Sequence, residues 1–186
     1  MSRTEYLETE RLSLRRISIK DADNLHAKIL GNKECLRYLD WNYSADVNET
    51  KAFIENIIYS YQKESYFFWV IEEKATQAFI GCIQVCNSDS KRHLAEIEYV
   101  ADTKAQGQGY ITEALKKVIV FLFQEAGYYR IEGVCNIENK ASARVMEKAG
   151  MLLEGTLRGR ALNLNEAGNP GDLKIYAILS SDIKGE

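Results

Sequence analysis

The order of the elements between residues 94 and 135 constrains the fold of this chain more than any other feature of the sequence. Leu94 to Val100 has the pattern of a strand, the apolar residues from Gly109 to Ala126 recur with helical spacing, and Arg130 to Cys135 again has the composition of a strand. A strand, a helix and a second strand in this order form a βαβ unit. The sequence therefore predicts a mixed sheet flanked by helices, of the α/β (α+β) class.

Further strands and helices are expected on both sides of this unit. The strands are Arg11 to Ile17, Tyr66 to Glu72, Phe79 to Val85, Leu152 to Arg158 and Leu173 to Leu179, and the helices are Ser18 to Leu30, Asn48 to Gln62 and Ala141 to Ala149. The polar stretch Asn87 to Ser90 suits a hairpin connection, and a Gly/Asn-rich loop covers Asn163 to Gly171. One proline and no low-complexity linker occur in 186 residues, so we expect a single domain over residues 1–186.

The composition excludes several classes of protein. A formal net charge of −3 offers no basic field for phosphates, so nucleic acid is not an expected partner. No apolar run reaches the roughly 18 residues that a membrane-spanning helix needs, and Met1 to Tyr6 lacks the apolar middle of a secretory signal. We therefore expect a cytoplasmic protein with reduced thiols and no membrane contact.

The four cysteines and two histidines show no spacing typical of zinc ligands, and no metal site is expected. Free cysteine behaves as a small hydrophobic residue. Cys35, Cys82, Cys86 and Cys135 are therefore expected to be structural, buried thiols. None occupies a position that predicts a nucleophile, which disfavours a covalent enzyme intermediate.

Two glycines mark the turn between the strand that ends at Val100 and the following helix, at Gly107 and Gly109. Glycine permits positive φ and lets main-chain N–H groups approach a ligand, while the helix N-terminus adds free donors and a positive dipole end. This combination is typical of a pyrophosphate cradle. The P-loop pattern is absent, and a dinucleotide fingerprint would need glycine where Thr112 stands. A plain glycine-assisted helix start is the simplest alternative.

Several segments resemble signatures of the GNAT superfamily of N-acetyltransferases. Asn139 to Gly155 resembles its second signature, and Lys104-x-x-Gly107-x-Gly109 resembles the first, in which glutamine or arginine is more common than lysine. Thr9 to Arg15, followed by Asp21, and Gly109 to Ala114 look like the branch that acetylates the N-termini of ribosomal proteins (Rim type). The resemblance implies a mostly antiparallel seven-stranded sheet with a splayed fourth and fifth strand.

The resemblance also implies a site for acetyl-CoA in the wedge between those two strands, here Leu94 to Val100 and Arg130 to Cys135. Its pyrophosphate would lie on the turn, and the amide of Tyr99 or Val100 would polarise the thioester carbonyl. The residues expected to contact acetyl-CoA are Tyr99, Val100, Lys104, Gln106, Gly107, Gln108, Gly109, Tyr110 and Asn139. Asn139 also suits a plain helix N-cap.

Acetyl transfer needs a neutral amine, and an α-amine loses its proton more easily than lysine does. Glu96 and Glu98 share one face of the fourth strand, and we favour Glu96 as the base; the alternative is that both are solvated or paired charges. Many relatives carry a tyrosine that acts as the general acid where this chain has Met146, whose thioether cannot donate a proton. The ribosomal branch carries a serine like Ser142, which is therefore the candidate acid, unless it is an ordinary first-turn residue.

The acceptor site is expected near the first loops. Trp41, Tyr38 and Tyr43 are candidate walls, whereas Phe68 and Trp69 are expected in the core. Leu36 to Ser44 is a candidate lid, and Asp40 or Glu34 is a candidate for attracting a cationic amine. We expect direct transfer to a protein α-amine by a monomer or homodimer. The alternatives are a small amine (a polyamine, amino acid or aminoglycoside) and a non-catalytic acyl-CoA-binding module.

Overall fold

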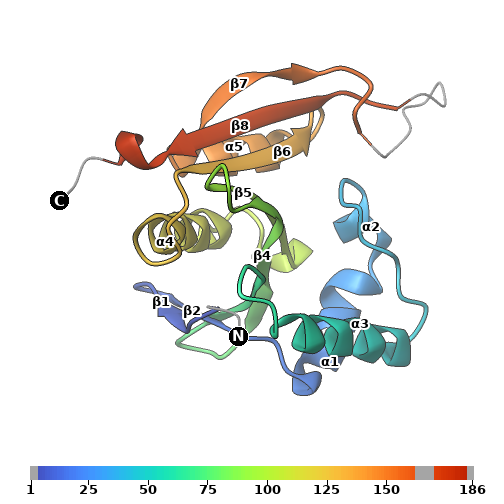
Figure 1. The fold of residues 1–186 in the computed structure, drawn as a ribbon. Helices are drawn as coiled ribbons and strands as arrows, with labels where there is room; N and C mark the ends of the chain where they lie inside the picture. Colours follow the sequence, from blue (N-terminus) through green and yellow to red (C-terminus); the bar gives the residue numbers. More distant parts are fainter. Residues whose placement is uncertain (1–3, 162–169, 184–186) are drawn as a thin grey trace.

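The centre of the structure, a computed structural model that describes residues 4–161 and 170–183, is an eight-stranded sheet (Figure 1). Its strands in spatial order are β1 (Leu7–Glu8), β2 (Leu12–Arg15), β3 (Phe67–Glu73), β4 (Phe79–Asp89), β5 (Leu94–Ala101), β6 (Arg130–Asn136), β8 (Leu173–Leu179) and β7 (Leu152–Leu157). All neighbours are antiparallel except β5 and β6. The expected mixed, mostly antiparallel fold is confirmed. The one strand beyond the seven expected is β1, a two-residue pairing with β2.

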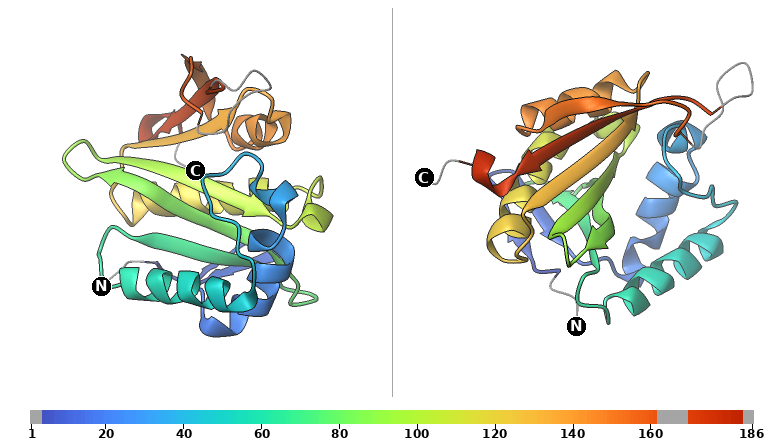
Figure 2. Two further views of the ribbon diagram at one scale, coloured as in Figure 1. Left: turned by 90° about the vertical axis from the view of Figure 1, so that its right-hand side faces the viewer. Right: turned by 45° about the horizontal axis from the view of Figure 1, so that its top comes forward.

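Helices cover both faces of this sheet (Figure 2). They are α1 (Ala22–Leu25), α2 (Lys33–Leu36), α3 (Val47–Ser60), α4 (Tyr110–Gln124) and α5 (Lys140–Lys148), with short turns η1 (Ile19–Asp21), η2 (His26–Leu30), η3 (Thr103–Ala105) and η4 (Ser180–Asp182). Alternation along β3 explains the two layers. Phe67, Trp69 and Ile71 join the apolar cluster under α4 and α5, while Phe68 and Val70 join the cluster under α1 and α3.

Capping residues set the start of the helices that flank the sheet. The Asp46 carboxylate accepts hydrogen bonds from the Asn48 and Glu49 amides before α3, and the Asn139 side chain accepts one from the Ser142 amide before α5. The helix expected over Ser18 to Leu30 is a succession of η1, α1 and the π-helical η2. The four-residue α2 was not expected, because four residues are too few to show a period.

Parallel pairing between β5 and β6 ends early. Only Leu94–Ile97 of β5 is in register with Arg130–Gly133 of β6, although both strands continue. A Cβ atom added at Gly133 would lie 2.8 Å from the Met146 sulfur, so this glycine lets α5 approach the strand closely. Beyond the pair of Ile97 and Gly133, β5 and β6 separate, and the splay expected between these two strands is present.

The loop between β4 and β5 is shorter than expected. The polar residues Asn87 to Asp89 were expected in a hairpin connection, but they extend β4, because β5 supplies partners as far as the pair of Asp89 and Leu94. A bulge at Cys86 interrupts the register between Val85 and Asn87. The Gly/Asn-rich loop expected over Asn163 to Gly171 lies outside the described residues except at its last two positions.

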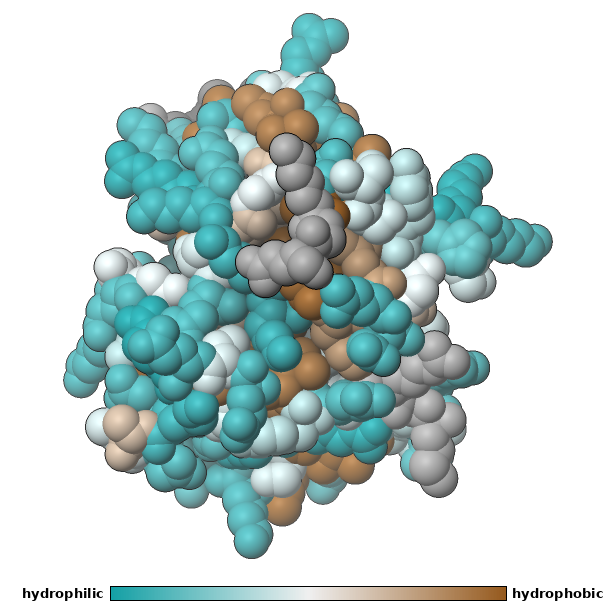
Figure 3. Space-filling view, turned by 90° about the vertical axis from the view of Figure 1, so that its left-hand side faces the viewer, coloured by the Kyte–Doolittle hydropathy of each residue, from teal (hydrophilic) through white to brown (hydrophobic). Residues whose placement is uncertain are grey.

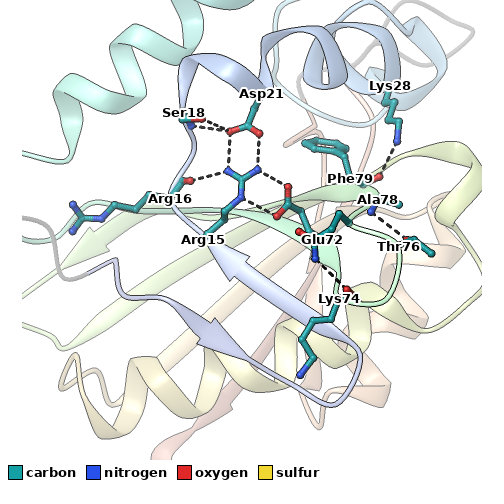
Figure 4. Close-up of polar contacts among 11 residues, drawn as sticks. Arg15, Arg16, Ser18, Asp21, Lys28, Glu72, Lys74, Thr76, Ala78 and Phe79 are labelled. Carbon is teal, nitrogen blue, oxygen red and sulfur yellow. Dashed lines mark hydrogen bonds and ion pairs between the residues drawn. The ribbon is translucent and has the colours of Figure 1, made fainter.

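A partly buried ionic network joins the N-terminal strands to the start of the first helix. Arg15 on β2 lies between Asp21 and Glu72, with its Nη2 2.6 Å from Asp21 Oδ1 and 2.5 Å from Glu72 Oε1 (Figure 4). Asp21 also accepts hydrogen bonds from the amide and hydroxyl of Ser18. Because these contacts join β2, β3 and the start of the first helix, they hold one edge of the sheet against the α1 layer.

The side of the molecule drawn in Figure 3 is mainly hydrophilic, with smaller patches of hydrophobic residues. Over residues 4–161 and 170–183, no helix combines the length and hydropathy required to span a bilayer.

Candidate active site

A cavity of about 1200 Å³ lies where β5 and β6 separate. Its walls come from both strands, the glycine turn, the N-terminal turns of α4 and α5, and the segment from α2 to Trp41. The expected site residues that line it are Glu96, Tyr99, Val100, Gln106, Gly107, Gly109, Tyr110, Asn139 and Ser142. The separation of the two strands thus brings together most of the residues singled out from the sequence.

The cavity passes from one face of the sheet to the other. On β5, Ile97 and Tyr99 belong to the side covered by α4 and α5, whereas Val100 belongs to the side covered by α1 and α3. Alternation places Glu96 and Glu98 on the Val100 side. Carboxylates and the Tyr99 hydroxyl therefore reach the same cavity from opposite faces of one strand.

The glycine turn forms one end of this cavity. Gly107 and Gly109 have φ values of 78° and 81°, a conformation that residues with a Cβ atom rarely adopt. No atom lies within 4 Å of a Cβ built on Gly107, so the backbone angle and not crowding requires glycine there. Within the described part of the chain, the N–H groups of Gly107 to Tyr110 have no acceptor. They are free to bind an anion at the start of α4.

Three other turn residues are placed differently from their expected contacts. Lys104 is exposed and Gln108 donates its side-chain amide to the Lys104 carbonyl, and neither lines the cavity. The Gln106 amide already donates to the Thr103 carbonyl at 3.4 Å. Anion binding at the turn therefore falls mainly to the amides of Gly107, Gly109 and Tyr110.

Three glutamates gather on the other side of the strand separation. Glu96 lies opposite Glu132 in the β5–β6 register. Glu132 is paired with Arg130, whose Nε lies 2.6 Å from its Oε1. Glu98 Oε2 accepts hydrogen bonds from the Trp41 indole at 2.6 Å and from the Gln84 amide at 2.8 Å. These partners hold two of the three carboxylates in fixed positions.

Glu96 differs from its two neighbours. Burial and then the charges of Glu132 and Glu98 raise the pKa of its carboxyl, and these effects outweigh Arg160 and a hydrogen bond from Asn87. A carboxylate with a raised pKa is a stronger proton acceptor than an exposed one. Because Trp41 and Gln84 hold Glu98, we favour Glu96 as the base.

Ser142 is held by two groups. Its amide donates to the Asn139 cap at 3.1 Å, and its Oγ lies 2.9 Å from the Tyr99 hydroxyl, which also donates to the Ser142 carbonyl at 3.0 Å. Burial raises the pKa of Tyr99 above its ordinary value, so this phenol stays protonated. Tyr99 and Ser142 form a hydroxyl pair that can hold or pass a proton.

The segment expected to be a lid meets the sheet through Trp41. Its ring contacts Phe53 and Phe68, with centroids 5.6 Å and 6.2 Å apart, and its indole reaches Glu98. Tyr38, Asp40 and Glu34 line the cavity, whereas Tyr43 is exposed outside it. Phe68 and Trp69 are completely buried, in agreement with the core position expected for them.

The thiols are not all buried as expected. Cys82 and Cys135 are buried, but Cys35 is half-buried and Cys86 is exposed, because it is the extra residue of the β4 bulge. Burial raises the pKa of Cys135 to about 11, which keeps its thiol protonated. In residues 4–161 and 170–183, no three His, Cys, Asp or Glu side chains are grouped to hold a metal ion.

Sequence reasoning missed three side chains of this site. It considered only the main chain of Tyr99, and it did not single out Gln84 or Glu132 as neighbours of the carboxylates. Side chains alternate between the two faces along Leu94 to Val100, so Tyr99 points to the face opposite that of Glu98. The phenol could therefore have been recognised as a site residue from this alternation. The partner of that phenol, 43 residues away on α5, could not.

Comparisons with known proteins agree with this geometry. The chain matches the Acetyltransferase (GNAT) domain family over residues 11–152. It is 31% identical over 173 residues to the uncharacterized N-acetyltransferase YoaA of Bacillus subtilis, covering 93% of this chain and 96% of that protein. It is 28% identical over 172 residues to the ribosomal-protein-serine acetyltransferase of Escherichia coli, covering 91% and 93%.

A solved structure of similar fold holds a ligand. A ribosomal-protein alpha-N-acetyltransferase in complex with coenzyme A matches with a TM-score of 0.84 and 25% identity, covering 94% of this chain and 98% of that chain.

Proposed function

Because the chain belongs to the GNAT family of acetyltransferases, we propose that its acceptor is the α-amine at the N-terminus of a protein. Membership of this family makes it an acetyl-CoA-dependent N-acetyltransferase. The names of the Escherichia coli relative and of the coenzyme A complex support the acceptor class. A single acetyltransferase domain over residues 1–186 and a cytoplasmic location belong to the same proposal.

The residues of the cavity fit acetyl-CoA. Free amides at Gly107, Gly109 and Tyr110 suit its pyrophosphate, and Asn139 borders the path toward the sheet. The cavity walls also include the basic residues Arg144 and Lys148 of α5, which suit further phosphate charge. Tyr99 and Val100 line the same space, and we propose that their main chain holds the acyl end. When bound there, acetyl-CoA supplies an acetyl group activated as a thioester.

Glu96 is the proposed base. It lies on the face of β5 that Trp41 and Gln84 border, and its raised pKa suits acceptance of a proton from the attacking amine, directly or through a water molecule. An α-amine has an ordinary pKa of about 7.7–8.0, so it needs only modest help to become neutral. Glu98, held by Trp41 and Gln84, would position the amine without taking its proton.

The Tyr99 and Ser142 hydroxyls are proposed to hydrogen-bond the leaving sulfur and to pass it a proton from water, so that both hydroxyls stay protonated. They reach the cavity from the face opposite Glu96, and the pair is 2.9 Å apart. The observation that carries the proposal is that a carboxylate, Glu96, and the Tyr99 and Ser142 hydroxyls line one opening in the sheet from its two sides. Such an arrangement suits direct attack from one face and departure toward the other.

One observation favours a second acceptor class. Glu96, Glu98 and Glu132 make the acceptor side of the cavity acidic, and Asp40 adds a further carboxylate at its border. A small amine with two positive charges would suit this surface as well as a protein terminus would. The two candidate acceptors differ in size. The cavity walls continue past Trp41 to residues of α2, and this length bears on whether a peptide can be accommodated.

An acetyl-transfer screen over serine- and alanine-initiated peptides and over small amines, with products identified by mass, separates the two. We expect peptide α-amines to be acetylated with the higher kcat/KM. The Glu96→Gln variant should lower kcat by about a hundredfold or more while acetyl-CoA binding is retained. Preference for a diamine over every peptide would refute the acceptor, and an unchanged kcat in the Glu96→Gln variant would refute the base.

A further inference from the structure

The N-terminal hairpin turn is attached directly to the glycine turn. Arg11, between β1 and β2, donates from Nη1 to the Gln108 carbonyl at 3.1 Å, and its guanidinium lies over the Tyr110 ring, 4.6 Å from the centroid. The two ends of this contact are 97 residues apart in the sequence. Arg11 therefore contacts the segment whose amides face the cavity, although Arg11 itself does not line that cavity.

Glu113 in the first turn of α4 completes the attachment. Its carboxylate accepts from the Arg11 amide at 3.0 Å, from the Arg11 Nε at 2.7 Å and from the Thr9 hydroxyl at 2.5 Å. Arg11 Nη2 lies 2.7 Å from the same carboxylate. A planar guanidinium can bridge a carboxylate and a carbonyl in this way, whereas an ammonium group cannot hold both in one plane.

Peptide geometry explains what this contact does to the turn. In a trans peptide the carbonyl and the N–H of the same unit point in opposite directions. Arg11, which does not line the cavity, binds the Gln108 carbonyl, so the N–H of Gly109 in the same peptide unit points away from Arg11, and Gly109 lines the cavity. Gly109 has a positive φ and no side chain to limit rotation, so an outside contact is needed to fix this direction.

Charge gives a second reason for the contact. Glu113 places a carboxylate one turn from amides that face an anion, and its side chain is 21% exposed. Left alone, this charge would repel a phosphate across that short distance. Arg11 pairs with it and adds a positive charge on the same side of the turn.

We propose that Arg11 is a positioning residue for acetyl-CoA: it fixes the Gln108–Gly109 peptide so that the turn presents its amides to the pyrophosphate. The inference rests on the cofactor position given under the proposed function. It gives the Thr9–Arg11 part of the N-terminal motif a role in donor binding.

The test compares Arg11→Gln with two controls. Arg92→Gln is the matched control, because Arg92 is an exposed arginine that pairs with Asp89 on a hairpin away from the cavity. Arg11→Lys keeps the positive charge but loses the planar guanidinium that binds both the Glu113 carboxylate and the Gln108 carbonyl. We expect Arg11→Gln to raise the acetyl-CoA dissociation constant, measured by calorimetry, about fivefold, with a smaller rise for Arg11→Lys and none for Arg92→Gln. The acceptor KM and the kcat at saturating acetyl-CoA should stay unchanged.

A truncated donor distinguishes positioning from a general structural role. S-acetylpantetheine lacks the pyrophosphate, so its kcat/KM should be the same in the wild type and in Arg11→Gln. An equal loss with both donors, or an acetyl-CoA affinity within twofold of the wild type, would overturn the proposal. If Arg11→Gln does not fold, the same comparison is made with Arg11→Lys.

The position of the cofactor is tested separately with Gly107→Val and Gly109→Val. If both variants fold and retain wild-type acetyl-CoA affinity, the cofactor site of the proposed function is wrong. If they lose affinity while Arg11→Gln does not, only the role of Arg11 is wrong.

Discussion

Replacing Asp21 by asparagine tests how much of the stability depends on the Arg15 network. Asp21 is 5% exposed and accepts four hydrogen bonds: from Arg15 Nη1 at 2.9 Å and Nη2 at 2.6 Å, and from the Ser18 amide at 2.8 Å and hydroxyl at 3.1 Å. Asparagine offers only one acceptor oxygen and turns an NH₂ group toward a donor. Removing one partner of a buried ion pair costs about 3–5 kcal/mol.

The structure places the expected loss at the lower end of that range. Glu72 still accepts from Arg15 at 2.8 Å and 2.5 Å, so the guanidinium is not left without a counter-charge. We expect the free energy of unfolding to fall by about 3 kcal/mol, which for a chain of this length corresponds to a Tm lower by roughly 6–12 °C. Urea unfolding followed by circular dichroism measures the difference.

The pH dependence gives an independent check. Burial acts to raise the pKa of Asp21, but hydrogen bonds from Arg15 and the Ser18 amide outweigh it, and the pKa is lowered. A lowered pKa contributes stability above the unfolded pKa of about 3.9, and this contribution is lost as pH falls through the folded pKa. The difference between wild type and variant should be constant from about pH 5 to 8 and should shrink below about pH 4.

The matched control is Asp23→Asn, two residues further along in α1, because Asp23 is exposed and the substitution should change stability by less than about 0.5 kcal/mol. A loss below about 1 kcal/mol for Asp21→Asn, or a difference that persists unchanged to about pH 3, would refute the reasoning.

Three further changes probe the site and its support. Glu132→Gln removes a charge that raises the pKa of Glu96, so the acidic limb of the kcat/KM profile should move to lower pH; no movement would contradict the assignment of Glu96. Tyr99→Phe removes the phenol from the Ser142 hydroxyl and should lower kcat about tenfold with acetyl-CoA affinity retained, whereas an unchanged kcat would exclude the hydroxyl pair. Gly81→Ala puts a Cβ atom 2.1 Å from a main-chain oxygen of β5 and should cost about 1–3 kcal/mol in urea unfolding; a neutral substitution would show that the strands can move apart freely.

The longer strands and helices could be predicted because most of them have a clear period or cap. The bounds expected for β8 are those observed, and α4 begins one residue later than expected and ends two residues earlier. The glycine turn predicted one end of the cavity, and the resemblance to the GNAT superfamily implied that the site lies between β5 and β6. Features that depend on local sequence patterns, such as these helices, strands and turns, could therefore be predicted from the sequence alone.

Contacts between distant residues could not be predicted in this way. Arg11 and Glu113 are 102 residues apart, and Trp41 and Glu98 are 57 apart, so no local spacing indicates either pair. The Gln106 amide is withdrawn from the turn by a local hydrogen bond to Thr103, which a list of residues does not reveal. The extension of β4 to Asp89 likewise depends on a partner strand that outweighs the turn preference of its polar residues.

The early end of the β5–β6 pairing has a consequence for the whole molecule. Four residue pairs, Leu94–Ile97 with Arg130–Gly133, connect the two halves of the sheet in parallel, and beyond them the facing strand edges have no strand between them. A pantetheine arm carries amide groups, so a donor molecule seated there would offer these edges the hydrogen bonds that a neighbouring strand normally provides. Under the proposed function, acetyl-CoA would therefore complete the sheet between β5 and β6 at each turnover, and the enzyme would lose these hydrogen bonds when the product leaves.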